Sequence, residues 1–232
     1  MPDTPSLNQH IYAIGQRMVA CRLECDGIHL DASKGILPRS LVLERQDRKE
    51  SRGSVALGIN PGQGDEEEEA FYLGHGNTYE AMLEFWNARR RLNHPYHART
   101  RRFIDAVGLD GPILWTELVK CQNPRGVKVI PPLPTLRRCV HLYLVQEIAA
   151  VPPAWPVVAI GKEPYKLAAL MFPSRTVIGI PHPTGSYGLF PALFDSAGGL
   201  TQHAHRLVTD ALASDMPAAV WLVDGTASKG AA

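Results

Sequence analysis

The chain has 232 residues, enough for one good-sized domain or two small ones, and its 45% hydrophobic and 20% charged content is ordinary for a globular protein. Its net charge of +1 excludes a polycationic chain that binds nucleic acid through overall charge, although a local basic patch can still do so. No apolar run is long enough to span a membrane, and the N-terminus lacks the basic start and apolar stretch of a signal peptide, so we expect a cytoplasmic protein with no membrane partner.

The first predicted elements are a helix and a strand, separated by a long connection. Apolar residues recur at helical spacing from Leu7 to Ala20. Residues 26–53 are mixed and carry many charges towards their end, which predicts an irregular, exposed connection. The apolar run from Ser54 then stops at Asn60-Pro61-Gly62, which predicts a buried strand that ends in a tight loop.

Charged segments lie on both sides of the next helix. The acidic run Asp65–Glu69 predicts a solvated loop. The stretch from Thr78 to Leu92 has a fair cap residue and an apolar stripe, and these predict a helix. The most basic segment is Arg89–Arg102, in which His and Tyr residues lie between the arginines. Such a segment suits contact with phosphates, and a solvated helix end explains it equally well.

The second half of the chain alternates apolar strands with helical stretches. We expect strands over Ile113–Lys120, Pro156–Gly161 and Thr176–Ile180, and helices over Leu136–Ala149, Lys162–Met171 and Gly199–Ala213. This alternation predicts a three-layer α/β/α fold around a central four-stranded, mainly parallel sheet. We expect a single domain over residues 1–224 and a disordered tail over residues 225–232.

Polar residues follow three of the predicted strands. Ligands of open parallel sheets bind just beyond the carboxyl ends of the strands. We therefore expect Asn60, Glu117–Lys120 and His182 to gather at one edge of the sheet. Pro61 stiffens the loop that carries Asn60, and Gly62 lets the backbone approach a ligand closely.

Two short motifs, in this order, resemble those of the uracil-DNA glycosylase superfamily. Gly58-Ile59-Asn60-Pro61-Gly62 looks like the first motif, in the form used by the mismatch-specific branch, and His182-Pro183-Thr184-Gly185-Ser186 resembles the second. The middle region, from Leu118-Val119-Lys120-Cys121 to Val158-Ala159-Ile160-Gly161, resembles the prokaryotic iron–sulfur branch. The resemblance covers roughly residues 7–193. It implies a DNA glycosylase of base-excision repair, which releases uracil or a related deaminated or altered base flipped out of DNA.

The four cysteines form two pairs, Cys21 with Cys25 and Cys121 with Cys139. In the cytoplasm they are expected as metal ligands or buried thiols rather than disulfides. The resemblance implies that the four thiolates hold a 4Fe–4S cluster away from the catalytic cleft. Neither pair has the Cys-x-x-Cys spacing of zinc hairpins, and the first pair has three intervening residues where the iron–sulfur branch has two. A structural zinc, or no cofactor at all, is the alternative.

Hydrolysis of an N-glycosidic bond needs two functions. The negative charge that grows on the leaving base must be stabilised, and a water must be held against the anomeric carbon. The resemblance assigns the first function to His182, and the Asn60 amide can hold the water. Around Asn60, the first motif implies substrate contacts by Gly58, Ile59, Pro61 and Gly62.

An extruded base also needs an aromatic face, and the DNA backbone needs polar contacts. Phe71 and Tyr72 follow the first motif and are the two candidates for the aromatic face, with core packing as the alternative for both. Gly185, Ser186 and Tyr187 resemble the loop that pinches the DNA backbone, and Tyr187 or Leu189 suits the space that the base leaves. We expect contacts with DNA from Thr184, Gly185, Ser186, Tyr187, Arg99, Arg101 and Arg102.

Glu117 is the main departure from the resembled pattern, because the iron–sulfur branch has there an Asn that reads the uracil edge. An ionised carboxylate only accepts hydrogen bonds, so it repels the 4-oxygen of uracil and suits an exocyclic amine. A buried Glu with a raised pKa can still donate. The identity of the base therefore stays open.

Two other functions fit the same fold. One is a non-catalytic protein that binds DNA or senses damage, and the other is a hydrolase of free nucleosides or nucleotides. The basic segment and the loop around Ser186 favour polymeric DNA as the partner. We expect the protein to be a monomer.

Overall fold

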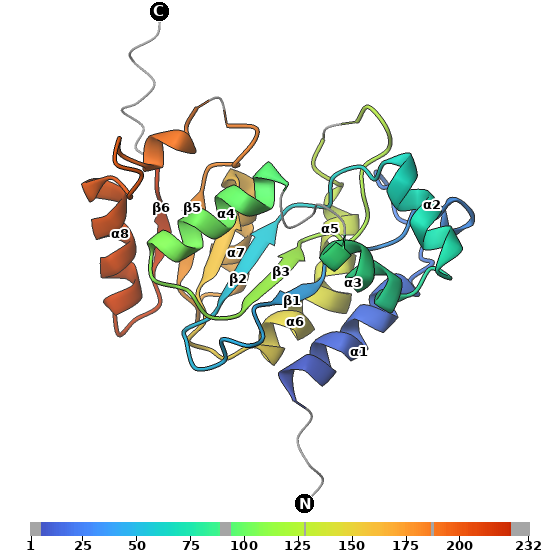
Figure 1. The fold of residues 1–232 in the computed structure, drawn as a ribbon, viewed down its shortest axis with the longest axis horizontal. Coiled ribbons are helices and arrows are strands. Elements are labelled where there is room, and N and C mark those ends of the chain that lie inside the picture. The colour runs from blue at the N-terminus through green and yellow to red at the C-terminus, as the bar shows by residue number, and fades with distance from the viewer. Residues whose placement is uncertain (1–5, 89–93, 128, 187, 224–232) are drawn as a thin grey trace, which may run out of the picture. The chain divides into compact units, whose positions relative to one another are not determined.

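The computed structural model describes residues 6–88, 94–127, 129–186 and 188–223 (Figure 1). The protein has a three-layer α/β/α fold, and the strands within these ranges form one six-stranded sheet in the order β1-β3-β2-β4-β5-β6. The strands are β1 Val42–Glu44, β2 Ser54–Gly58, β3 Ile113–Glu117, β4 Val157–Ile160, β5 Val177–Ile180 and β6 Ala219–Trp221.

Most helices lie where the apolar spacing predicts them. The α-helices are α1 Leu7–Val19, α2 Glu66–Gly74, α3 Tyr79–Ala88, α4 Pro95–Ala106, α5 Leu133–Cys139, α6 Val145–Ala150, α7 Lys162–Met171 and α8 Gln202–Ala213. Short helical turns are the 3-10 turns η1 Ala32–Lys34 and η4 Pro191–Leu193, and the π turn η3 Val140–Leu144 between α5 and α6. No helix in the described ranges combines the length and hydropathy that crossing a bilayer requires.

The four predicted strands are confirmed as β2, β3, β4 and β5, and two further strands lie at the sheet edges. β1 and β6 have three residues each. Edge strands this short contain too few residues for a periodic pattern, and they take their conformation from the neighbouring strand. The sequence therefore predicted a four-stranded sheet where the protein has six strands in its described part.

The chain divides into two compact units, although the sequence predicted one domain over residues 1–224. Unit 1 consists of Met1–Glu44, Gly58–Leu92 and Leu114–Pro152, and unit 2 consists of Arg45–Leu57, Asn93–Ile113 and Pro153–Ala232. Each unit is therefore assembled from segments that are far apart in the sequence. The predicted tail, residues 225–232, lies outside the described ranges.

Unit 2 contains parallel strands whose carboxyl ends share one edge. Val55 of β2, Val157 of β4, Val177 of β5 and Ala219 of β6 lie side by side in one row of the parallel register. β4 and β5 are buried over their whole length, as expected for parallel strands with helices on both faces. Figure 1 shows α4 in front of these strands and α7 behind them.

In unit 1, α1 packs against α3, α6 and β1. The Ser6 side chain caps α1, and Ile11, Ile14 and Met18 form its buried stripe. Gly15 is required at the contact with α3, because a β-carbon there would overlap the Tyr79 ring.

Two segments of unit 1 differ from the sequence expectation. The connection over residues 26–53 is not exposed throughout, because Leu37 and Leu41 are fully buried beside β1. The acidic run is not a loop, because Asp65 caps α2 and Glu66–Glu69 form its first turn. Acidic side chains are stabilised at a helix N-terminus by the unpaired N–H groups and the helix dipole, so the run is a helix-start signal.

Candidate functional site

The Asn60 side chain is held in one orientation by Asn123. Asn60 Nδ2 donates to Asn123 Oδ1 over 3.1 Å, and Asn123 Nδ2 donates to the carbonyl of Val129 over 2.9 Å. Because a carbonyl only accepts, the second bond decides which way round the Asn123 amide lies. Asn60 therefore directs its amide nitrogen to Asn123, and its Oδ1 points away as a hydrogen-bond acceptor.

The rest of the first-motif loop is bound to the segment that follows Cys121. Gln63 Nε2 donates to the carbonyl of Pro124 over 2.7 Å, and the N–H of Gly64 donates to Gln122 Oε1 over 2.9 Å. These bonds act together with the Asn60 contact, so the loop is fixed along its length within unit 1.

A buried arginine, Arg39, donates a hydrogen bond to the same loop. The Arg39 guanidinium donates to the carbonyl of Gly62, and its Nε lies 3.3 Å from Glu68 Oε1. Glu68 also accepts from the Tyr72 hydroxyl over 2.9 Å. Arg39, Glu68 and Tyr72 are 5%, 2% and 2% exposed, so this pair is shielded from solvent.

Only one of the two predicted aromatic residues keeps exposed area. Tyr72 is a core residue, which corrects its prediction as a stacking face for the base. Phe71 is half-buried, and its ring stacks on His75 with 3.9 Å between the ring centroids and 15° between the planes. Phe71 therefore remains the candidate for an aromatic contact.

Glu117 ends β3 directly beside the first motif. The N–H of Leu118 donates to the carbonyl of Gly58, and Val119 donates to Ile59. A β-carbon at position 58 would overlap the Glu117 carboxyl, which explains the glycine in the motif. Burial raises the pKa of Glu117 to about 8, although Lys120 and Arg39 act in the opposite direction.

Lys120 forms a buried ion pair with Glu147 and also contacts the backbone of Glu117. Its Nζ lies 2.8 Å from Glu147 Oε2, and it also donates to the Thr116 hydroxyl and to the Glu117 carbonyl. Lys120 and Glu147 are both fully buried. Removal of one partner would leave an uncompensated charge in the core, so this pair fixes the end of β3 in place.

The four cysteines lie in one neighbourhood of unit 1, brought together from the segments after α1 and β3 and from α5. Burial raises the pKa of the Cys121 thiol, and the fields of Cys139, Cys21 and Cys25 raise it further. The Tyr143 hydroxyl forms a hydrogen bond with Cys21, and burial together with this bond raises the pKa of Tyr143. Burial likewise raises the pKa of the Cys139 thiol. A bound cation would favour the thiolate forms of Cys121 and Cys139 instead.

Two donors face the sulfur atoms of this cluster. The N–H of Lys120 donates to Cys139 Sγ over 3.3 Å, and Arg138 Nη1 lies 3.6 Å from Cys25 Sγ. Within residues 6–88, 94–127, 129–186 and 188–223, no three His, Cys, Asp or Glu side chains form a group that could hold a metal ion. The thiols are therefore not arranged as a metal site in the structure. Soft sulfur ligands, with N–H donors to two of them, are nevertheless the donor type that an iron–sulfur cluster uses.

His182 follows β5 in unit 2, and a hydrogen bond within its loop indicates which ring nitrogen accepts. The N–H of Thr184 donates to His182 Nδ1 over 3.3 Å, so this nitrogen is an acceptor and the neutral ring carries its proton on Nε2. The Tyr96 ring of α4 lies 5.3 Å from the imidazole. His182 is exposed at the surface, and partial burial of its ring lowers its pKa.

A cavity of about 410 Å³ adjoins the loop after His182. Arg99 of α4 forms one wall and donates to the carbonyl of Pro183 over 2.7 Å. Ser186 Oγ accepts from the N–H of Phe190 over 3.1 Å. The cavity is lined by Arg99, Pro183, Thr184, Gly185, Ser186, Gly188 and Pro191. Tyr187 lies outside the described residues.

The predicted basic segment contributes to unit 2 through specific contacts. Arg102 lies 4.3 Å above the Phe194 ring and donates to the carbonyl of Gly198 over 2.9 Å. Arg101 is half-buried on the same helix. Arg99 and Arg102 therefore hold the segments on either side of η4 as well as carrying charge. Arg89, Arg90 and Arg91 lie outside the described ranges.

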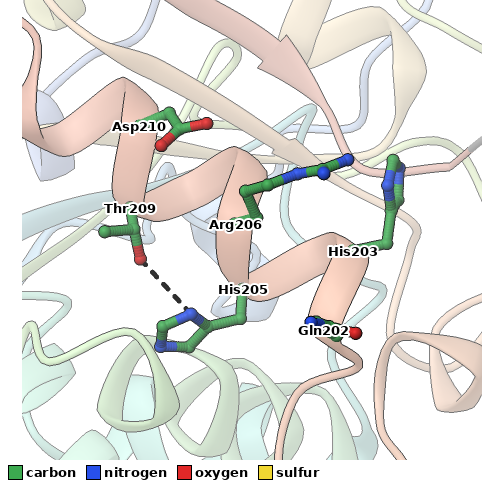
Figure 2. A pocket seen from close by; sticks show the side chains of 6 residues that line it. All are labelled: Gln202, His203, His205, Arg206, Thr209 and Asp210. Atoms are coloured by element: carbon green, nitrogen blue, oxygen red, sulfur yellow. Dashed lines mark hydrogen bonds between the residues drawn. The ribbon is translucent and has the colours of Figure 1, made fainter.

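A second cavity in unit 2, of about 490 Å³, is formed by one helix (Figure 2). Its lining residues all come from α8: Gln202, His203, His205, Arg206, Thr209 and Asp210. His205 Nδ1 lies 3.5 Å from the Thr209 hydroxyl. These exposed residues provide matched control positions for the site residues.

Comparison with known proteins adds no relative to this description. No protein-family model matches the chain, and no curated protein matches its sequence. The resemblance therefore depends on the two short motifs and the cysteines, and the geometry above is independent of it.

Sequence reasoning missed four residues that contact the candidate residues: in unit 1 Arg39, Gln122 and Asn123, and in unit 2 Tyr96. Their roles depend on partners far away in the sequence, so no local pattern marks them. The one available signal was that Gln122-Asn123-Pro124 directly follows Cys121, where a strand-end loop is expected to be polar.

Proposed function

We propose that the protein is a DNA glycosylase, which hydrolyses the bond between a deaminated or otherwise altered base and its deoxyribose. The observation that carries the proposal is the backbone N–H of Thr184 at His182 Nδ1, from which we infer that the neutral ring carries its proton on Nε2. A neutral imidazole with its proton on Nε2 is the form that can donate to a base as negative charge develops on it. The loop bond to Nδ1 and the lowered pKa of His182 both favour this form at neutral pH.

Asn60 supports the second half of the reaction. Its Oδ1 points away from Asn123 and can accept a hydrogen bond from the attacking water. An amide is a weak base, so its contribution is to place the water against the anomeric carbon. This suffices when the transition state resembles an oxocarbenium ion, because the sugar is then already electron-poor.

The proposed step balances as a simple hydrolysis. The N-glycosidic bond breaks and its electron pair stays on the base, which His182 stabilises through the Nε2–H bond. The oxygen of the water forms the new bond to the anomeric carbon and releases one proton to solvent, and the departing base anion takes up one proton from solvent. The products are the free base and an abasic deoxyribose in DNA.

The cavity beside His182 supports DNA as the substrate. Arg99 contributes a positive charge there, and the Ser186 hydroxyl, which accepts from Phe190, still has its own hydrogen to donate to a phosphate. Gly185 lies so close that a β-carbon would sit 3.3 Å from His182 Nδ1, which keeps the loop tight around the histidine. Phe71 is the proposed aromatic contact for the extruded base.

A 4Fe–4S cluster is the proposed cofactor, and Cys21, Cys25, Cys121 and Cys139 would hold it. When bound, the cluster cross-links distant chain segments and stabilises the fold. The residues around it keep those thiols in place, because Lys120 donates its N–H to Cys139 and Arg138 faces Cys25.

The test is a panel of oligonucleotides, each carrying one altered base, incubated with the protein and then treated with alkali to cleave abasic sites. We expect strand scission with uracil or a related base. Asn60→Ala and His182→Ala should each lower the single-turnover rate by ~100-fold or more while DNA affinity changes little. Their combined effect should be less than additive if both residues serve one step.

Matched controls separate these effects from general damage. Asn87→Ala in α3 and His205→Ala in α8 change exposed residues of the same types and should leave the rate intact. Salt-dependent DNA binding without any abasic product would instead identify a non-catalytic DNA-binding protein. Release of base from free nucleosides, and not from oligonucleotides, would identify a nucleoside hydrolase.

A further inference from the structure

We infer that Glu117 contacts the substrate base as a neutral carboxylic acid, so that the protein accepts bases with adjacent N–H and C=O groups, such as uracil and hypoxanthine. This inference rests on the proposed function and adds a specificity-determining residue to it. It is carried by the position of the Glu117 carboxyl and by the charges around it.

The position is that of a group aimed at the first-motif loop. Glu117 is the last residue of β3, and its carboxyl lies against Gly58. Two backbone hydrogen bonds hold the two strand ends together at this point, from Leu118 to Gly58 and from Val119 to Ile59. Asn60, which we propose to hold the water, follows two residues after Gly58.

One oxygen of the Glu117 carboxyl makes no hydrogen bond within the described part of the protein. In the described part of the chain, Glu117 Oε2 is buried and has no hydrogen-bond partner. Buried polar atoms are normally paired, and exceptions point to a strained group or to an absent ligand. A contact with a substrate base would satisfy this oxygen.

The cations near Glu117 are already engaged with other carboxylates. Lys120, in the loop after β3, pairs with Glu147 of α6 over 2.8 Å. Arg39, in the segment before β1, pairs with Glu68 of α2 over 3.3 Å. Desolvation therefore outweighs the fields of Lys120 and Arg39, and the pKa of Glu117 is raised to about 8. At neutral pH most Glu117 side chains carry the proton.

The protonation state decides which base edges Glu117 can contact. A neutral acid has one O–H donor and one C=O acceptor, which match the C=O and N–H of uracil or hypoxanthine. An ionised carboxylate has only acceptors, so one of its oxygens would face the carbonyl oxygen of the base. Loss of the proton therefore removes this class of base while the rest of the site is unchanged.

Glu117→Gln tests the inference, because an amide keeps one donor and one acceptor at every pH. We expect the wild-type rate with uracil-containing or hypoxanthine-containing oligonucleotides to fall about tenfold per pH unit above a pH of about 8. The Glu117→Gln protein should keep its rate over the same range. Glu163→Gln, which changes an exposed glutamate of α7, should behave like the wild type. An equal alkaline loss in the wild type and in Glu117→Gln would overturn the inference.

Infrared spectroscopy and the binding of free uracil test Glu117 without relying on catalysis. The wild type should show the carbonyl stretch of a protonated carboxyl at neutral pH, and Glu117→Gln should lack it. Free uracil should bind the wild type at about pH 6.5 and about tenfold more weakly at about pH 9, where uracil still keeps most of its own N–H proton, with no such change in Glu117→Gln. Should no oligonucleotide be cut, the proposed function fails, and these two measurements still decide the inference. An ionised Glu117 at neutral pH, or pH-independent uracil binding, would refute it.

Discussion

Asn60 Nδ2 lies 3.1 Å from Asn123 Oδ1, and this hydrogen bond links the loop after β2 to the segment after β3. Asn123 is oriented in turn by its bond to the Val129 carbonyl. The amide that we propose to hold water is thus positioned by a second amide, so that its orientation is set before substrate binds. Preorganisation of this kind lowers the reorganisation needed in the transition state.

Asn123→Ala should therefore lower the rate of base release by ~10-fold without a comparable change in DNA affinity. Asn123→Asp should have a smaller effect, because a carboxylate still accepts from Asn60 although it no longer donates to Val129. Single-turnover kinetics and DNA titrations measure the two quantities, with Asn87→Ala as the exposed control. A loss confined to DNA affinity would contradict the positioning role.

The pH profile of base release should have an acidic limb that belongs to His182. The active form is neutral, and partial burial lowers the pKa of His182 from its ordinary value of 6.5. The rate should therefore hold as the pH falls to 6.5 and decline only below that, by about tenfold per pH unit. In His182→Gln the residual rate should lack this limb. A limb centred above 6.5 would show that His182 is stabilised in its charged form instead.

The purified protein should contain about four irons and four sulfides per chain and absorb visible light. Replacement by Ala of any one of Cys21, Cys25, Cys121 and Cys139 should remove iron and lower solubility together, because the cluster joins distant segments. Arg138→Ala should retain its iron, since it keeps all four thiols and removes only a 3.6 Å contact to Cys25. Stoichiometric zinc without iron would contradict the cluster.

The arginines of α4 should contribute to DNA affinity through charge. Joint replacement of Arg99, Arg101 and Arg102 by Ala should weaken binding about equally for all sequences and lower the salt slope by about one for each phosphate that the protein no longer neutralises. Arg99→Ala alone should also slow base release, because Arg99 holds the carbonyl of Pro183 next to His182. Arg206→Ala in α8 is the exposed control. An unchanged salt slope in the triple variant would leave these arginines a purely structural role.

Local pattern was sufficient where an element has enough residues to show its period. Lys162–Met171 was predicted as a helix with the bounds that α7 has, and the buried runs of β4 and β5 were predicted within one residue. β1 and β6 were missed because three residues at a sheet edge carry no period. The acidic run was misassigned because clustered carboxylates are typical both of solvated loops and of helix starts, and only the cap at Asp65 distinguishes them.

The sequence by itself determined the α/β/α class, because alternating apolar strands and amphipathic helices have few other ways to bury their apolar faces. It also identified Asn60, His182 and the four cysteines as candidates through motif and spacing. Only the tertiary structure decided how these residues are presented: which nitrogen of His182 accepts, which way Asn60 turns, and why the pKa of Glu117 is raised. Those properties depend on hydrogen bonds and desolvation between residues that are remote in the chain, and no local pattern records them.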